Sequence, residues 1–167
     1  MPDEGRLSLL PPALAASLRT APAAVLRIFA VRCARLAITE TALDEPEVHE
    51  ALAVAEWLSS GGDATSDRAA QARRMIDAVV RRLDEIGFKI HRRAEEEDRF
   101  GTAEFQTEYA AAFNRARAAN AVATSLLPEP LAAAGETAYE MAEGIGVEMN
   151  RLIALSEECG CAPGSGE

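Results

Sequence analysis

Aromatic residues and cysteine are scarce in this chain of 167 residues, and no run of apolar residues is long. Phe, Tyr and Trp make up 5% of the sequence, whereas apolar residues as a whole reach 49% because alanine is abundant. Alanine is the best helix former and lets helices approach closely, so this balance favours packed helices over a sheet. No stretch approaches the ~20 apolar residues of a membrane span, so we expect a soluble helical domain that has no membrane partner.

The three cysteines are an odd number and do not form a disulfide framework. Residues 1–5 are acidic and contain no basic start followed by an apolar run, so we expect no signal peptide. Both observations favour a reducing compartment. The sequence therefore predicts a cytoplasmic protein.

The net charge is −10, from 27 acidic and 17 basic residues. Binding to the phosphate backbone of nucleic acid needs a basic surface, so we expect no nucleic-acid partner. An acidic surface permits a cationic protein partner.

Apolar residues recur at helical spacing in two long segments. The first comprises Ala72, Ile76, Val79, Leu83, Ile86 and Ile90, and the second Phe105, Tyr109, Ala112, Ala116, Ala119, Ala123 and Leu126. Steps of four and three place these side chains on one side of a helix, which must be buried against other helices. The pattern predicts an all-α fold, a single compact bundle of five or six helices over residues 1–167, with flexible ends at 1–10 and 161–167.

Prolines and capping residues mark the expected helix boundaries. Ser66 and Asp67 can cap a long helix that continues through Gly87 towards Phe100, and Thr102 can cap the helix that follows. These two segments are suited to an antiparallel hairpin. The other expected helices are a short one opened by Pro11 and Pro12, and those spanning about 22–43, 44–61 and 136–158.

Two neighbouring stretches resemble known bacterial helical proteins. The stretch Leu26–Arg35 reads LRIFAVRCAR, and Glu50–Gly61 reads EALAVAEWLSSG. The first resembles the LRLFACACCRR segment, and the second the AVEVAERYADG segment, of an uncharacterised alanine-rich module of planctomycete-type proteins. A similar pairing of an F-x-x-x-C-A helix with an A-L-x-x-A-x-x-W-x-x-G helix occurs in helical immunity proteins of bacterial polymorphic-toxin systems.

This resemblance carries no catalytic residue over to the chain. The immunity resemblance implies a protein that binds and blocks a toxin and performs no chemistry. Trp57, the only tryptophan, is expected to pack as a core anchor.

Cysteine and histidine offer few starting points for catalysis. Cys33 is in phase with Phe29 and Leu36, so we expect a buried thiol that acts as a small hydrophobic group. A nucleophilic thiol needs a nearby base. Only His49 and His91 exist, and the sequence places neither beside Cys33.

Metal binding has equally little support. Cys159-Gly160-Cys161 supplies two of the four ligands of a typical structural zinc site, and a flexible tail is the favoured interpretation. His91 and Glu95 are four residues apart on a helix, but the chain has no Glu-x-x-His pair of the ferritin-like type. We therefore predict no catalytic residue, no metal and no cofactor.

The long charged segment is the candidate contact surface. Eight of the seventeen basic residues lie between positions 68 and 93, and an acidic run follows at Glu95–Asp98. Such charges usually mark a solvated face, and the alternative is a docking strip for a partner. The residues predicted to bind the partner are Arg81, Arg82, Lys89, Arg92, Arg93, Glu96 and Asp98.

The leading hypothesis is a non-enzymatic protein-binding module, immunity-like or regulatory, whose partner is another protein such as a toxin. One alternative is a small metal-binding or enzymatic bundle that uses His49, His91 or the cysteines. Another is a structural protein that assembles into homo-oligomers through its long helices.

Overall fold

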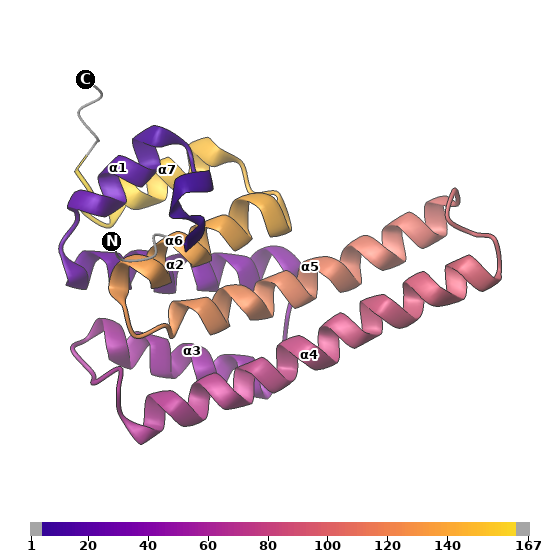
Figure 1. Cartoon of the computed structure of the whole chain (residues 1–167), viewed down its shortest axis with the longest axis horizontal. Coiled ribbons are helices and arrows are strands. Elements are labelled where there is room, and N and C mark those ends of the chain that lie inside the picture. Colours follow the sequence, from indigo (N-terminus) through magenta and orange to yellow (C-terminus); the bar gives the residue numbers. More distant parts are fainter. Residues whose placement is uncertain (1–4, 163–167) are drawn as a thin grey trace.

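A computed structural model describes residues 5–162, and every regular element in this range is a helix (Figure 1). The all-α prediction is confirmed, but the described residues form seven α-helices rather than five or six. The elements are the 3₁₀-helix η1 (Gly5–Leu9), α1 (Pro12–Thr20), α2 (Ala23–Thr41), α3 (Pro46–Ser59), α4 (Asp67–Glu96), α5 (Ala103–Ser125), α6 (Pro130–Tyr139), the π-helix η2 (Glu140–Ile145) and α7 (Met149–Glu158). Among the described helices, none combines the length and apolar content needed to cross a membrane.

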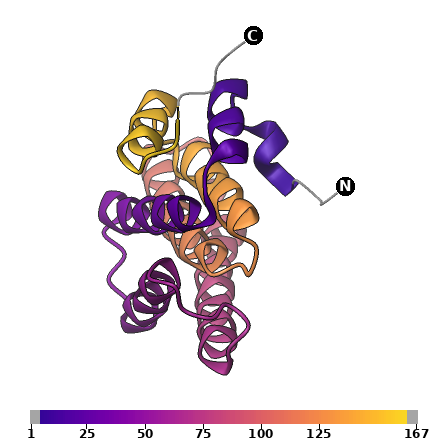
Figure 2. The same cartoon turned by 90° about the vertical axis from the view of Figure 1, so that its left-hand side faces the viewer.

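The helices are stacked in three tiers. In Figure 1, α3 and α4 lie at the bottom, α2, α5 and α6 in the middle, and α1 and α7 at the top, and the view in Figure 2 agrees. The core runs through the middle tier, where Phe29 of α2 and Leu126 after α5 are fully buried. Buried alanines such as Ala119 let these helices approach closely. Cys33 lies in the same core, which confirms its predicted burial.

Side-chain caps begin the two long helices at the predicted residues. The Ser66 hydroxyl accepts a hydrogen bond from the Ala69 N–H at 3.3 Å, and the Thr102 hydroxyl accepts one from the Phe105 N–H, also at 3.3 Å. The helix α4 ends at Glu96, short of the predicted Phe100. It stops because Asp98 adopts a left-handed conformation (φ 53°) that turns the chain.

The predicted helix over 136–158 is wrong: the structure has three segments there. The first, α6, begins at Pro130 and continues into the π-helix η2. Gly146 then takes φ +81°, and the Val147 N–H donates to the Met141 carbonyl at 2.9 Å. This left-handed residue ends the helical path, so α7 starts afresh at Met149.

The structure describes part of the two ends that were predicted to be flexible, residues 5–10 and 161–162. Leu7 and Leu10 are buried near the start, and Cys161 is buried after α7. Leu7, Leu10 and Cys161 pack into the hydrophobic core. The sequence around them contains short Gly- and Pro-containing segments, which do not show that these side chains are buried. Residues 1–4 and 163–167 lie outside the described part of the chain.

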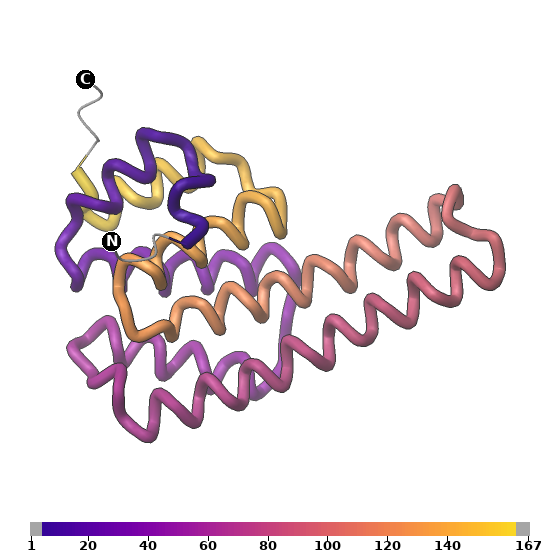
Figure 3. The backbone as a smooth tube through the Cα atoms, in the orientation of Figure 1, coloured from indigo at the N-terminus to yellow at the C-terminus, as the bar shows by residue number. Residues whose placement is uncertain are grey.

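The predicted antiparallel hairpin is present as α4 and α5, but only part of it belongs to the bundle. Figure 3 shows its outer half extending well beyond the other helices. Ion pairs hold its base: Arg82 and Arg115 both pair with Glu45, which precedes α3, and Arg117 pairs with Glu140 of η2. We call residues 81–117 the arm.

Gly87 occupies an interior position of α4 in the arm. A Cβ atom added there would meet no heavy atom within 4 Å. Glycine inside a helix costs about 0.5–1 kcal/mol relative to alanine, because the unfolded chain loses more conformational freedom. We expect Gly87→Ala to raise the free energy of unfolding by about 0.5–1 kcal/mol, measured by urea denaturation. A fall in stability would show that the methyl group is not accommodated.

Candidate interaction surface

Aromatic rings line the arm where α4 and α5 face each other. The His91 ring of α4 lies 4.8 Å from the Phe100 ring and 6.0 Å from the Tyr109 ring, measured between centroids. Phe105 and Tyr109 stack at 5.6 Å, and Tyr109 and Phe113 stack at 6.2 Å. These rings join the two helices without help from a third.

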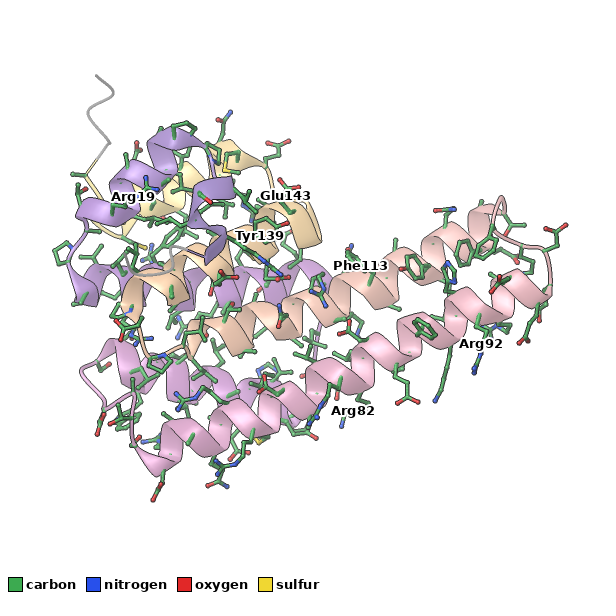
Figure 4. The ribbon with its side chains drawn as sticks, in the orientation of Figure 1. Arg19, Arg82, Arg92, Phe113, Tyr139 and Glu143 are labelled. Atoms are coloured by element: carbon green, nitrogen blue, oxygen red, sulfur yellow. The ribbon has the colours of Figure 1, made fainter. Side chains whose placement is uncertain are left out.

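One side of the arm carries an open groove of about 380 Å³ between α4 and α5. Phe88, 72% exposed, stands at its edge, and Phe113 is 39% exposed. Figure 4 shows Phe113 on α5 closer to the bundle and Arg92 farther out on α4. The groove is lined by Leu83, Asp84, Gly87, Phe88, His91, Tyr109, Phe113 and Ala116.

Arg117 fixes the bundle end of this groove. Its guanidinium pairs with Asp84 across the arm at 3.0 Å and with Glu140 of η2 at 3.4 Å, and lies 5.6 Å from the Phe113 ring centroid. Glu140 is only 1% exposed and also pairs with Arg6 at 2.6 Å. A buried carboxylate needs such partners, so η2 ties the base of the arm to the N-terminal 3₁₀-helix.

The seven residues predicted to bind a partner are all exposed, and none of them lines the groove between α4 and α5. Arg81 instead borders a separate open pocket with Arg74, Asp77 and Val80. Three are held in ion pairs within the chain: Arg82 with Glu45, Lys89 with Glu85 at 3.0 Å, and Arg93 with Glu108 at 2.6 Å. The other four have no ion-pair partner among residues 5–162; these are Arg81, Arg92, Glu96 and Asp98.

Sequence reasoning did not select the apolar residues of this surface. Phe88 lies out of phase with the buried stripe, which was a visible signal that its ring faces solvent. Ile86 was placed within the stripe but is 45% exposed. The stripe prediction fails at Ile86 because the arm has no third helix to cover that side of α4.

The two histidines lie in different parts of the described chain. His49 is exposed and pairs with Asp44 at 3.0 Å, while His91 belongs to the aromatic cluster of the arm. Cys33 is buried on α2. Within residues 5–162, no group of three or more His, Cys, Asp or Glu side chains is placed to hold a metal ion.

All three thiols belong to the core: Cys33 and Cys161 are buried in it, and Cys159 packs against it. Burial raises the pKa of Cys33 well above its usual value and also raises the pKa of Cys159 and of Cys161. Neutral thiols are poor nucleophiles and poor metal ligands. The flexible-tail interpretation of Cys159-Gly160-Cys161 is wrong for Cys161, because its side chain packs into the core.

Trp57 is half-buried at the end of α3 and packs against the core. The guanidinium of Arg68 lies 4.6 Å from its ring centroid. A Cβ at Gly62 would approach this ring to 2.5 Å, so the turn after α3 needs a glycine there. Trp57 thus anchors the turn after α3.

Comparison with known proteins gave no match to a protein-family model, to a curated protein or to a solved structure. The arm, with its aromatic groove and exposed Phe88, is the candidate functional surface.

Proposed function

We propose that this chain is a non-enzymatic protein-binding module that acts through the groove side of the arm. One observation carries the proposal: a phenylalanine that is 72% exposed stands beside an aromatic-lined groove on a projecting helical hairpin. Large exposed aromatic side chains cost free energy in water and are frequent at the centres of protein interfaces.

The groove suits a helical partner. It runs between two antiparallel helices, and an amphipathic helix can lay its apolar face into such a groove with anchors at i, i+3, i+4 and i+7. Phe88 and Phe113 border the groove, so both rings would lose water contact when a partner docks. The projection of the arm leaves room for that partner beside the bundle.

The unpaired charges provide selectivity. Arg81, Arg92 and Glu96 are exposed and have no ion-pair partner among the described residues, so they are available to a partner of complementary charge. Exposed charges at the edge of an interface affect the association rate and the choice of partner more than the affinity.

The role we propose for this binding is immunity-like or regulatory: the chain alters a partner protein by contact. The sequence resemblance to helical immunity proteins supports this role. Its genomic test is direct, because an immunity gene lies beside its toxin gene. A toxin gene next to this one is expected, and its absence would count against the immunity role while leaving the binding proposal intact.

Binding through the groove is tested by a photo-crosslinking amino acid at position 88. We expect a discrete protein–protein crosslink from position 88 in the native host. We also expect Phe88→Asp to weaken the same complex at least tenfold, or about 1.4 kcal/mol, because a charge would replace the anchoring ring.

Leu9 provides the matched control, since it is an exposed apolar residue on η1, outside the arm. A crosslinker at position 9 should give no such product, and Leu9→Asp should leave binding unchanged. Equal crosslinking from both positions, or full binding by Phe88→Asp, would refute a docking role for the groove.

A further inference from the structure

We infer that the partner that docks on the arm is a second copy of this chain. In this complex two α4 helices lie antiparallel, with Phe88 on the two-fold axis. The inference rests on the proposed function and names the partner of the same groove. It takes the regulatory form of that function, in which the groove is filled by the chain itself and not by a toxin. It is argued from the charges of the arm, their register along α4 and the shape of the groove.

The arm is the part of the chain where two copies meet with least repulsion. Residues 81–117 contain eight basic and eight acidic residues, so the whole net charge of −10 belongs to the rest of the chain. Two copies that met through the bundle would bring negative surfaces together. Contact through the arm avoids this cost.

The charges on α4 are self-complementary about Phe88. Arg81 and Glu95 lie seven residues to either side of Phe88, and Asp84 and Arg92 lie four residues to either side. At ~100° per residue, all four lie within about 40° of Phe88 around the helix.

An antiparallel two-fold arrangement pairs each residue with the one equally far on the other side of Phe88. Arg81 therefore meets Glu95 of the second copy, and Asp84 meets Arg92 of the second copy. Symmetry repeats both contacts, so the interface contains four oppositely charged pairs. Arg81, Arg92 and Glu95 are exposed and have no ion-pair partner among residues 5–162, so only Asp84 exchanges a partner.

The same register brings the start of the acidic run near two arginines. Glu95 and Glu96, the last two residues of α4, lie beside positions 81 and 80 of the other copy, close to Arg74 and Arg81. Both arginines are exposed and without an ion-pair partner in the described chain. Glu95 and Glu96 therefore gain cations that their own copy does not supply, whereas Glu97 already pairs with Arg99 at 3.0 Å.

The groove accepts the ring that the second copy presents. Phe88 of each copy faces the groove beside Phe88 of the other, and Gly87 contributes no side chain to obstruct it. Small residues on one helix and a large ring on the other give the interdigitated packing seen between paired helices. The two bundles then lie at opposite ends of the paired arms.

Charge exchange between two sites tests the register. The mass of the purified chain is measured by sedimentation equilibrium across a concentration series. The wild-type chain is expected to dimerise. Arg81→Glu and Glu95→Arg are each expected to weaken the dimer about tenfold, because each places like charges together twice. The double variant, which restores opposite charges, is expected to return to within about threefold of wild type.

Lys89→Glu is the control, because it changes the net charge as Arg81→Glu does but lies about 100° away from Phe88 around α4. It is expected to leave the dimer intact. Failure of the double variant to recover would overturn the register, and a wild-type chain that stays monomeric would overturn self-association. A monomer that still crosslinks to a different protein from position 88 would leave the proposed function standing; with no crosslink at all, both fail.

Discussion

Replacing Arg27 by methionine is expected to lower the free energy of unfolding by about 3 kcal/mol. Arg27 of α2 is only 7% exposed, and burial lowers its pKa. Its guanidinium donates to the carbonyl oxygens of Leu127, at 2.6 Å, and of Pro128, just beyond the end of α5. Methionine fills a similar volume but donates no hydrogen bond, and a hydrogen bond to a charged group contributes roughly 1.5–3 kcal/mol.

The loss is measured by urea denaturation, with Arg35→Met as the matched control on the same helix. Arg35 is exposed and pairs with Glu56 at 2.6 Å, and exposed ion pairs contribute roughly 0–1 kcal/mol. We expect the control to lose less than about 1 kcal/mol. Equal losses from both variants would mean that Arg27 does not hold the connection between α5 and α6.

Helix starts were predictable because they depend on local chemistry. A hydroxyl side chain can reach an N–H group three residues later whatever the rest of the fold does, so Ser66 and Thr102 could be placed from the sequence. Helix ends were less predictable. The stop at Glu96 depends on a left-handed Asp98, a conformation that few residues other than glycine adopt.

The helix break after η2 could not be predicted from the apolar residues on either side of it. Met141 and Leu152 are both buried, and their spacing continues a helical stripe across the break. The pattern reports which side chains face the core, and it does not report whether the backbone between them stays helical. Gly146 is the residue whose type indicates a possible break at this point of the sequence.

The amino-acid composition also distinguishes the arm from the bundle. Five of the eight aromatic residues of the chain lie within residues 81–117. In the bundle, alanine is sufficient to bury the apolar face of each helix, because neighbouring helices lie close by. A two-helix arm has no further layer, so large rings must supply the buried area. The sequence therefore indicated the segment that carries the candidate surface. The predicted contact residues were all charged, and Phe88, which lies out of phase with the buried stripe, was not among them.

Native Cys33 is expected to react with iodoacetamide at pH 8 at least about a thousandfold more slowly than in the urea-unfolded chain. Alkylation needs an exposed thiolate. The side chain of Cys33 is fully buried on α2, and burial raises its pKa, so the native thiol is both inaccessible and neutral at pH 8. Reaction then requires an opening of the core, which costs several kcal/mol.

Site-resolved mass spectrometry would follow all three thiols in one sample. Half-buried Cys159 serves as the internal reference and should react before Cys33. The comparison also tests whether the chain works by contact, because an enzymatic role for Cys33 requires an accessible thiolate with a base beside it. Rapid alkylation of Cys33 in the folded chain would restore that rival role, whereas protection is the result that the proposed contact role predicts.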